Sequence, residues 1–259
     1  MLYDTHAHLD APKLYPQIEQ VLERAGQAGL AIVNTIGCDW KSSLLALRLA
    51  ERFSTPQLQI YAAVGYHPTD SGELSEELLE RLFEQAQSPR CVAWGEIGLD
   101  YYWPQPEHDW QKQAFVKQID AASQLGLPLI IHDRDAHQDL LSILKRERAK
   151  LHGGVLHCCS CSWEMAKECL RLGFYISFAG PLTFHNARVA LEVAAKAPLE
   201  RLLVETDCPY LAPEPLRGRC NEPAFVAHTV ARLAQLRGLD SQEMGNICCE
   251  NGKRLFNIQ

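Results

Sequence analysis

The sequence predicts a single (β/α)8 barrel of the TIM type, and three observations favour this fold class. Short apolar segments rich in β-branched residues alternate eight times with segments of helical periodicity. Most of the apolar segments end in a histidine or a carboxylate. The length of 259 residues is also close to the roughly 250 residues that a (β/α)8 barrel needs.

The eight apolar segments are the expected strands, and the periodic segments between them are the expected helices. A strand, a helix and a second strand form the repeating unit of a parallel sheet. Glycine follows four of the helical segments, where a left-handed cap favours it, at Gly29, Gly126, Gly173 and Gly238. The expected strands are residues 2–6, 31–36, 60–65, 91–96, 128–132, 154–157, 174–177 and 202–205. The expected helices are residues 15–28, 41–52, 75–87, 107–125, 136–149, 162–172, 187–196, 223–237 and 241–256.

The placement of the polar residues decides between a closed barrel and an open doubly wound sheet, which eight strands also allow. In a barrel the carboxyl ends of all strands meet at one face, so their polar residues converge. In an open sheet the ends of distant strands stay apart. No linker, low-complexity tract or charge block divides the chain. We therefore expect one domain over residues 1–259, with a metal site at the C-terminal face of the strands.

Composition and charge exclude several classes of protein. With 47% hydrophobic and 22% charged residues the chain is typical of a globular protein. It has no run of about 18 apolar residues that would cross a membrane. It begins MLYDTHAHLD, which is too polar for a signal peptide, so we expect a cytoplasmic protein. A net charge of −7 argues against coating of nucleic acid, but bound cations can dominate a local field and leave a metal-dependent nuclease possible.

The ten cysteines are expected to be reduced, because nothing in the sequence indicates export. Cys158, Cys159 and Cys161 follow His157 closely and invite comparison with a structural zinc site. Such sites usually show two pairs of ligands, and a second pair is missing here. We favour small buried thiols over a structural zinc site.

The first candidate ligands are His6 and His8, at the end of the first strand. Alternation along a strand places residues two apart on the same side, so both imidazoles can face the barrel mouth. Glu96 ends the fourth strand between Gly95 and Gly98, where a cation has room to approach. Taken singly, these residues also fit a polar loop with two histidines and a glutamate in an ion pair.

Further candidates end the fifth, sixth and eighth strands. His132 and His157 each close an apolar run, where a lone histidine is more often a hydrogen-bonded core residue. Asp207 follows the last strand, and burial of its charge requires a cation or a strong donor. Glu205 can orient a ligand imidazole from behind. Four histidines and two carboxylates at five strand ends indicate one or two divalent cations better than they indicate packing.

Several motifs, taken in order, resemble the TatD family of metal-dependent deoxyribonucleases, within the amidohydrolase-like barrels. The match runs from DTHAHLD through AAVGYHP, GEIGLDYY, LPLIIHDRDAH, GVLHCCSCS, GFYISFAG and VETDCPYLAP to RGRCNEP and NGKRLF. The resemblance implies that one metal is held by His6, His8, Glu96 and Asp207. It implies that Glu96 bridges to a second metal held by His132 and His157. It also implies that His67 and Arg134 line the substrate pocket, and that the activity is hydrolysis of DNA phosphodiesters, often from the 3′ end.

The chain departs from the family pattern at a few positions. Cys158, Cys159 and Cys161 stand where relatives more often read HCFSGS, and Cys220 replaces a basic or polar residue. Asp133 stands where serine is frequent, and an acidic group there is expected to weaken binding of a polyanion. These departures bear on the range of substrates more than on metal binding.

The expected mechanism is two-metal hydrolysis by a 3′–5′ exonuclease, with catalytic roles for Asp207 as the base and Glu96 as the bridge. Arg134 and His67 would bind phosphate oxygens, since a guanidinium fork suits phosphate geometry. In the segment 101–103, Tyr102 and its aromatic neighbours either stack on bases of a single strand or form a packed lid.

Other functions remain open on the sequence alone. The same ligands serve a metallohydrolase of a small ester, lactone, amide or phosphoester, and an inherited barrel can also serve as a non-catalytic binding protein. Mg²⁺, Mn²⁺ and Zn²⁺ are all candidates for the two cations, although histidine ligands favour manganese and zinc. The partners expected are DNA or a small phosphoester. We expect a monomer with no membrane contact and no obligate protein partner.

Overall fold

The computed structural model describes all of residues 1–259, and its eight strands form one parallel sheet in the order β1 to β8. The sheet closes on itself through a parallel bridge between Ala7, at the end of β1, and Cys208, in the loop after β8. The predicted (β/α)8 barrel is therefore confirmed. The strands are β1 (Leu2–Ala7), β2 (Leu30–Ile36), β3 (Gln59–Val64), β4 (Cys91–Asp100), β5 (Leu129–Arg134), β6 (Gly154–Leu156), β7 (Phe174–Phe178) and β8 (Leu202–Val204).

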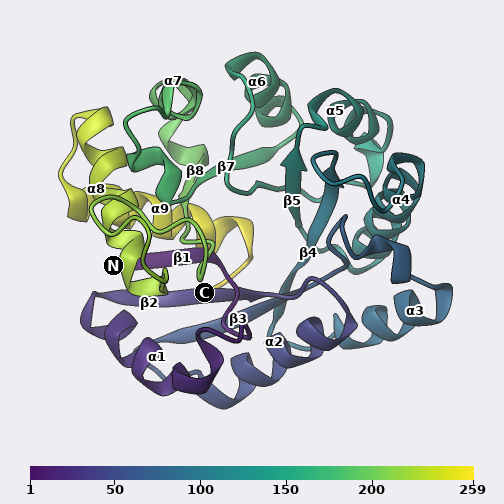
Figure 1. The fold of residues 1–259 in the computed structure, drawn as a ribbon, viewed down its shortest axis with the longest axis horizontal. Helices are drawn as coiled ribbons and strands as arrows, with labels where there is room; N and C mark the ends of the chain where they lie inside the picture. The colour runs from purple at the N-terminus through teal and green to yellow at the C-terminus, as the bar shows by residue number, and fades with distance from the viewer.

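The helices form an outer ring around these strands (Figure 1). Two of the predicted helices begin as short 3-10 turns, at Tyr15–Gln17 and Pro223–Phe225, and each turn has a proline near its start, where the missing N–H costs no hydrogen bond. No helix is both long and apolar enough to cross a bilayer. The helices are α1 (Ile18–Gln27), α2 (Trp40–Phe53), α3 (Glu76–Gln85), α4 (His108–Leu125), α5 (His137–Arg146), α6 (Trp163–Arg171), α7 (Arg188–Lys196), α8 (Val226–Arg237) and α9 (Ser241–Leu255).

Two apolar clusters hold the barrel together. The larger one lies between the strands and the surrounding helices, and the smaller one includes alternate residues of the strands. Neighbours such as Leu129 and Ile130 fall into different clusters, as side chains on opposite faces of a strand must. Cys249 and Phe256 of α9 join the smaller cluster beside Tyr3 of β1. The last helix therefore packs against the seam between the first and last strands.

Strand β4 is longer than the sequence indicated, because it continues past Glu96 to Asp100. Its added residues pair with β5, with Gly98 opposite His132 and Asp100 opposite Arg134. Gly98 adopts a φ of 144°, and a Cβ atom there would lie 2.1 Å from the carbonyl oxygen of His132. The glycine thus permits the close approach of the two strands that carry Glu96 and His132.

Replacement of Gly98 by alanine is expected to lower the free energy of unfolding by about 3 kcal/mol or more, since it adds a backbone clash to an unfavourable φ. Urea unfolding of both proteins measures the change. Gly238→Ala is the matched control, because Gly238 also has a positive φ but has open space around its Cβ; it should cost about 1 kcal/mol. Equal losses in the two variants would contradict the proposed role of close packing.

Candidate metal centre

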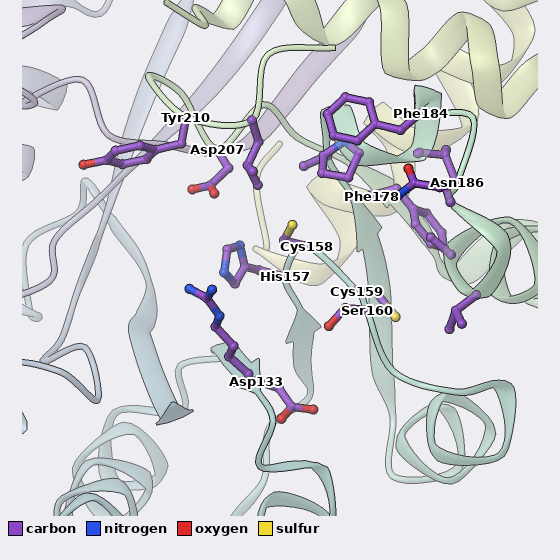
Figure 2. A pocket seen from close by; sticks show the side chains of 18 of the residues that line it. Asp133, His157, Cys158, Cys159, Ser160, Phe178, Phe184, Asn186, Asp207 and Tyr210 are labelled. Atoms are coloured by element: carbon purple, nitrogen blue, oxygen red, sulfur yellow. The ribbon is translucent and has the colours of Figure 1, made fainter. Parts of the chain in front are cut away.

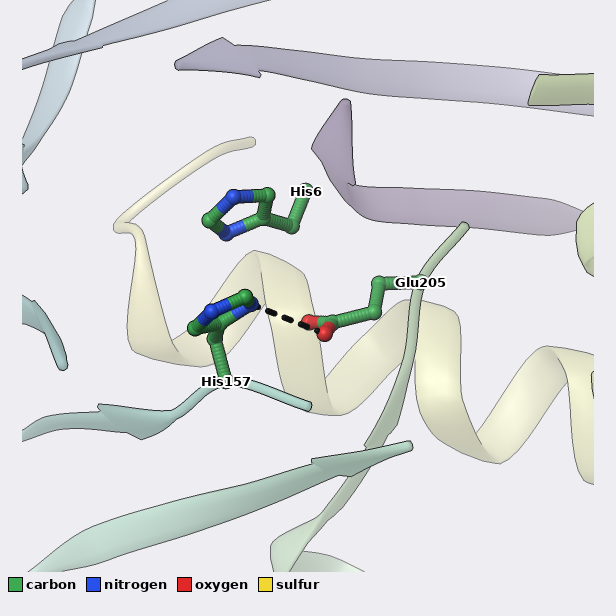
Figure 3. A group of neighbouring side chains, drawn as sticks. All are labelled: His6, His157 and Glu205. Carbon is green, nitrogen blue, oxygen red and sulfur yellow. Dashed lines mark hydrogen bonds and ion pairs between the residues drawn. The ribbon is translucent and has the colours of Figure 1, made fainter. Parts of the chain in front are cut away.

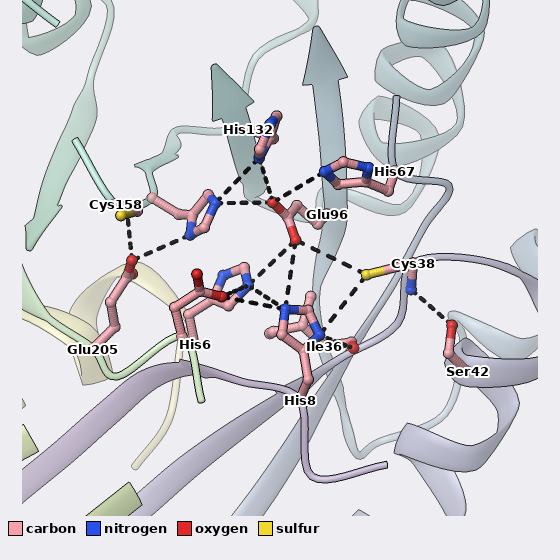
Figure 4. Close-up of polar contacts among 12 residues, drawn as sticks. His6, His8, Ile36, Cys38, Ser42, His67, Glu96, His132, Cys158 and Glu205 are labelled. Carbon is pink, nitrogen blue, oxygen red and sulfur yellow. Dashed lines mark hydrogen bonds and ion pairs between the residues drawn. The ribbon is translucent and has the colours of Figure 1, made fainter. Parts of the chain in front are cut away.

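The first group of converging donors joins the ends of β1, β4 and β8 (Figure 4). Nε2 of His6 lies 3.2 Å from Nε2 of His8 and 3.3 Å from Oε2 of Glu96. Oδ1 of Asp207 lies 3.4 Å from Nε2 of His8 and 3.7 Å from Nε2 of His6. The barrel closure explains this meeting, since the Asp207 N–H donates to the carbonyl oxygen of His6 at 2.9 Å.

The second group uses the other oxygen of Glu96. Oε1 lies 2.8 Å from Nδ1 of His132 and 2.8 Å from Nε2 of His157. The two imidazole nitrogens are 3.4 Å apart. Glu96 thus presents one oxygen to each group of histidines.

The donor atoms fit divalent cations. A tetrahedral zinc ion with Zn–N distances of about 2.0–2.1 Å separates neighbouring ligands by about 3.3–3.4 Å. The separations in the first group run from 3.2 Å between the imidazoles to 3.8 Å between Nε2 of His8 and Oε2 of Glu96, and they bracket that value. The set combines imidazole and carboxylate donors, which suit zinc and manganese.

Contacts behind the donors fix their orientation. Oε1 of Glu205 lies 3.1 Å from Nδ1 of His157 and also accepts the Cys158 N–H at 2.6 Å (Figure 3). Nε2 of His157 is thereby turned toward Glu96, and the His6 ring stacks on the His157 ring at 4.0 Å. His8 is held in the same way, with Nδ1 3.2 Å from the carbonyl oxygen of Ile36. The orienting role expected for Glu205 agrees with this geometry.

Two residues of the site were missing from the sequence interpretation. Oδ2 of Asp100 lies 3.0 Å from Nε2 of His132, whose other nitrogen faces Glu96. Asp100 is four residues after Glu96, so strand periodicity alone places both carboxylates on one side. The other residue is Cys38, after β2, whose Sγ is 3.8 Å from Nδ1 of His8. No motif in the sequence indicated the place of this thiol.

The carboxylates and imidazoles perturb one another strongly. Burial alone would raise the pKa of Glu96, but His157, His6 and His67 hold that pKa well below its ordinary value. Burial opposes the charge of His157, yet Glu96 and Glu205 raise the pKa of this imidazole well above its usual range. The metal-free site therefore holds protons on imidazole, and a bound cation must displace them. Metal affinity is expected to fall as the pH falls.

A pocket of about 890 Å³ opens beside the donor groups. Figure 2 shows the side chains of His157 and Asp207 pointing into it, with Phe178 and Phe184 farther along. Arg134, one of the three residues predicted to bind substrate, also lines the pocket. The arrangement thus places ionised carboxylates, imidazoles and one guanidinium at the end of a largely apolar cavity.

The other two expected substrate residues lie outside the lining of this pocket. His67 is on the far side of the cluster, with Nε2 3.7 Å from Oε1 of Glu96 and Nδ1 2.6 Å from Oγ1 of Thr69. Burial lowers the pKa of His67 to about 3, so its ring is neutral. Tyr102 is 54% exposed, and its ring lies 3.7 Å below the guanidinium carbon of Arg134. It can therefore act on a substrate only at the pocket mouth.

Comparison with known proteins identifies the family. The model of the TatD related DNase family matches residues 3–257. The chain belongs to this family. It is 43% identical to YabD of Bacillus subtilis (strain 168), named as a metal-dependent hydrolase, over 100% of both chains. It is 34% identical to the 3′–5′ ssDNA/RNA exonuclease TatD of Enterobacter lignolyticus (strain SCF1) over 99% of both.

A solved structure supports the same assignment. The TatD homolog YjjV of Escherichia coli K12 superposes with a TM-score of 0.91 at 33% sequence identity, covering 100% of this chain and 98% of that one. The chain is therefore a metal-dependent hydrolase of the TatD family with the barrel fold of its relatives.

The cysteines that depart from the TatD pattern form no group of three converging donors. All ten cysteines of the chain are free thiols. Sγ of Cys159 lies 3.6 Å from Sγ of Cys161, and both residues are buried. The four groups of converging donors contain only histidines and carboxylates. Cys159 and Cys161 are thus buried as expected, whereas Cys158 is half-buried and Cys220 is exposed.

Asp133, which departs from the TatD family pattern, forms a hydrogen bond with a nearby histidine. Nδ1–H of His137 donates to Oδ2 of Asp133 at 2.6 Å, and this hydrogen bond raises the pKa of His137 above its ordinary value. A protonated His137 offsets the carboxylate that was expected to weaken binding of a polyanion. The charge around Asp133 therefore depends on His137 as well as on the carboxylate.

The pKa of His137 in the folded protein should exceed the usual value of about 6.5, and Asp133→Asn should return it toward that value. Because the folded pKa is raised, this pair stabilises the protein fully below about pH 6.5 and loses that effect as the pH rises through the raised pKa. An NMR titration of the His137 ring protons measures both proteins. The same pKa in both would show that Asp133 does not cause the shift.

Proposed function

We propose that this chain is a deoxyribonuclease of the 3′–5′ exonuclease type that works with two divalent cations. The observation that carries the proposal is that the two carboxylate oxygens of Glu96 face different pairs of histidines. Oε2 faces His6 and His8, and Oε1 faces His132 and His157. A carboxylate placed in this way suits a bridge between two ions. The exonuclease named among the relatives supports the substrate class.

The two groups of donors would each hold one ion. Glu96 would belong to both, and the remaining ligands would be His6, His8 and Asp207 for one ion and His132 and His157 for the other. Ions bound there would lower the pKa of a water molecule toward about 7 and would polarise the phosphoryl oxygens. The imidazole-rich set favours Mn²⁺ or Zn²⁺, and Mg²⁺ is the third candidate.

The chain's own groups would bind the substrate and move the proton. Asp207 lines the pocket, and its carboxylate stays ionised because the His8 contact lowers its pKa against the effect of burial. It would accept the proton of the attacking water at a carboxylate oxygen. Arg134 at the same pocket would donate to the non-bridging phosphate oxygens, for which a guanidinium fork is well suited. Glu205 and Asp100 would hold the ligand imidazoles in place.

The test compares nucleic acid with small substrates. The purified protein is stripped of metal, reloaded with Mg²⁺, Mn²⁺ or Zn²⁺, and given single-stranded DNA labelled at either end. A 3′–5′ exonuclease releases the 3′ label as a mononucleotide at once, while the 5′-labelled strand shortens in steps. A panel of small esters, lactones and phosphoesters is assayed in parallel.

Two variants separate the site from the rest of the protein. His6→Ala should abolish the metal-dependent shortening, whereas His152→Ala should not, because His152 is exposed before β6 at the opposite end of the barrel. An intact oligonucleotide with metal-dependent turnover of a small ester would move the substrate to the alternative class. The largely apolar wall of the pocket is the observation that keeps this alternative open.

A further inference from the structure

The pocket beside the metal centre extends well beyond the space that a phosphate needs. Its volume of about 890 Å³ falls in the range of about 300–1,000 Å³ found for sites that enclose small organic ligands. One end carries His157 and Asp207, and the wall beyond them comes from Phe178 of β7, from Leu182 of the 3-10 turn η4 (Gly180–Thr183), and from Phe184. A substrate with its phosphate at the metal centre would place an adjoining group against this wall.

Positive charge is gathered around the same pocket, although the chain as a whole has a net charge of −7. Arg134 and Arg188 line the pocket, and the guanidinium carbon of Arg217 lies 4.4 Å from the centre of the Phe184 ring. The nearby acidic groups are largely engaged: Asp133 accepts from His137, and Glu214 lies 3.9 Å from Arg217. The guanidinium groups therefore favour a ligand that carries phosphate.

Phe184 has the features of a stacking platform. Its ring is half-buried and lines the pocket, and the Arg217 guanidinium lies over it. Asn186 lies two residues further on, is exposed, and also lines the pocket, so its amide can exchange hydrogen bonds with a polar ring edge. An aromatic ring, a guanidinium and an amide together suit a nucleobase better than an acyl chain.

We infer that this wall is the subsite for the 3′-terminal nucleotide, with its base stacked on Phe184 and its 5′ phosphate at the metal centre. The inference rests on the proposed function and names the part of the substrate that the pocket recognises. Stacking is tolerant of sequence because every base has a π-face, so the subsite selects for the presence of a base and not for its identity. It differs from the segment around Tyr102, which lies outside the pocket lining.

The experiment uses two 5′-labelled oligonucleotides that differ only in the last residue, which is a thymidine or an abasic tetrahydrofuran. The measured quantity is the ratio of kcat/KM for the first over the second, for removal of the terminal residue. Wild type is expected to prefer the thymidine end by about tenfold, equivalent to about 1.4 kcal/mol of stacking. Phe184→Ala should reduce this ratio to about one to two, and Phe184→Trp should restore it.

Phe53→Ala is the matched control. Phe53 is also a half-buried phenylalanine with an arginine over its ring, at 5.0 Å, but it ends α2 at the opposite end of the barrel from the metal centre. The Phe53→Ala substitution should leave the ratio of the two kcat/KM values unchanged. Thermal unfolding of each variant shows that the barrel is intact, and Phe184→Leu, which keeps an apolar side chain without an aromatic face, should behave like Phe184→Ala.

The outcomes distinguish the inference from the function beneath it. Cleavage of both oligonucleotides by wild type with no preference for the base, or an unchanged ratio in Phe184→Ala, would overturn the subsite and leave the nuclease standing. Failure of wild type to cleave either oligonucleotide with any of the three metals would overturn the nuclease, and the subsite with it. A ratio that falls in Phe184→Ala and Phe184→Leu and returns in Phe184→Trp supports the subsite.

Discussion

Asp207→Asn is expected to lower kcat for strand hydrolysis by about a hundredfold to ten-thousandfold, the usual range for loss of a general base. The asparagine side chain keeps the shape and one oxygen ligand, but its amide cannot accept the proton of the attacking water. Asparagine also tolerates the left-handed backbone of this residue, whose φ is 55°. The variant therefore tests the proton acceptor with the least disturbance of the loop after β8.

Metal content and the pH profile identify the cause of the loss. Elemental analysis should find nearly as much bound metal as in wild type, and the decline of kcat at low pH that reports an ionising base should disappear. Asp109→Asn is the control, since this carboxylate on α4 is 83% exposed and should leave kcat unchanged. An Asp207→Asn protein with full activity and full metal content would rule out Asp207 as the base.

If Glu96 bridges two ions as proposed, Glu96→Gln is expected to reduce the bound metal from two ions to one or none. It should also lower hydrolysis by about a thousandfold or more, because such ions would stabilise charge by several kcal/mol in the transition state. The amide offers one oxygen where the carboxylate offers two, so its NH2 group must face one pair of histidines. It also removes the buried negative charge that keeps His157 protonated in the metal-free protein. The loss of the bridge thus affects both ions at once.

Glu205→Gln is the comparison variant, and a smaller loss of metal binding is expected for it than for Glu96→Gln. Glu205 contacts only Nδ1 of His157 and the Cys158 N–H, so its loss should weaken metal affinity by about tenfold to a hundredfold without changing the number of sites. Metal titration followed by thermal unfolding measures both variants, since a ligand that binds the folded state raises Tm. Two tightly bound ions in Glu96→Gln would contradict the bridging role.

The barrel was predictable because its signals are local. An apolar run, a helical period and a glycine stop each depend on a few neighbouring residues, and eight repeats in order leave few alternatives. The convergence of the predicted donor residues followed for the same reason, since all strand ends meet at one face. Asp100 was missed because the fourth strand was expected to end at Glu96, whereas β4 continues beside β5 to Asp100.

The pocket could not be predicted from the sequence, because its walls come from segments that are distant along the chain and meet only at the C-terminal face of the barrel. Phe184 and Arg217 are far apart along the chain, and no period or motif links them. For the aromatic segment after β4, the sequence left base stacking and a packed lid as alternatives, and the contacts of Tyr101 favour packing. The Tyr101 hydroxyl donates to Asp139 and its ring stacks on His108 at 3.6 Å, so this member of the segment is packed against helices and turned away from a substrate.

The seam between β1 and β8 has a consequence for how the protein is made. His6 and His8 leave the ribosome near the start of synthesis, whereas Asp207, which lies against them, follows about two hundred residues later. Contacts so distant along the chain are slow to form, because a long loop must close first. A nascent chain therefore carries the first two donors of the candidate metal centre for most of translation without the residues that complete it. A cation that met the chain early would find an open, partial set of donors, so any selectivity of the centre for one metal would arise only in the finished molecule.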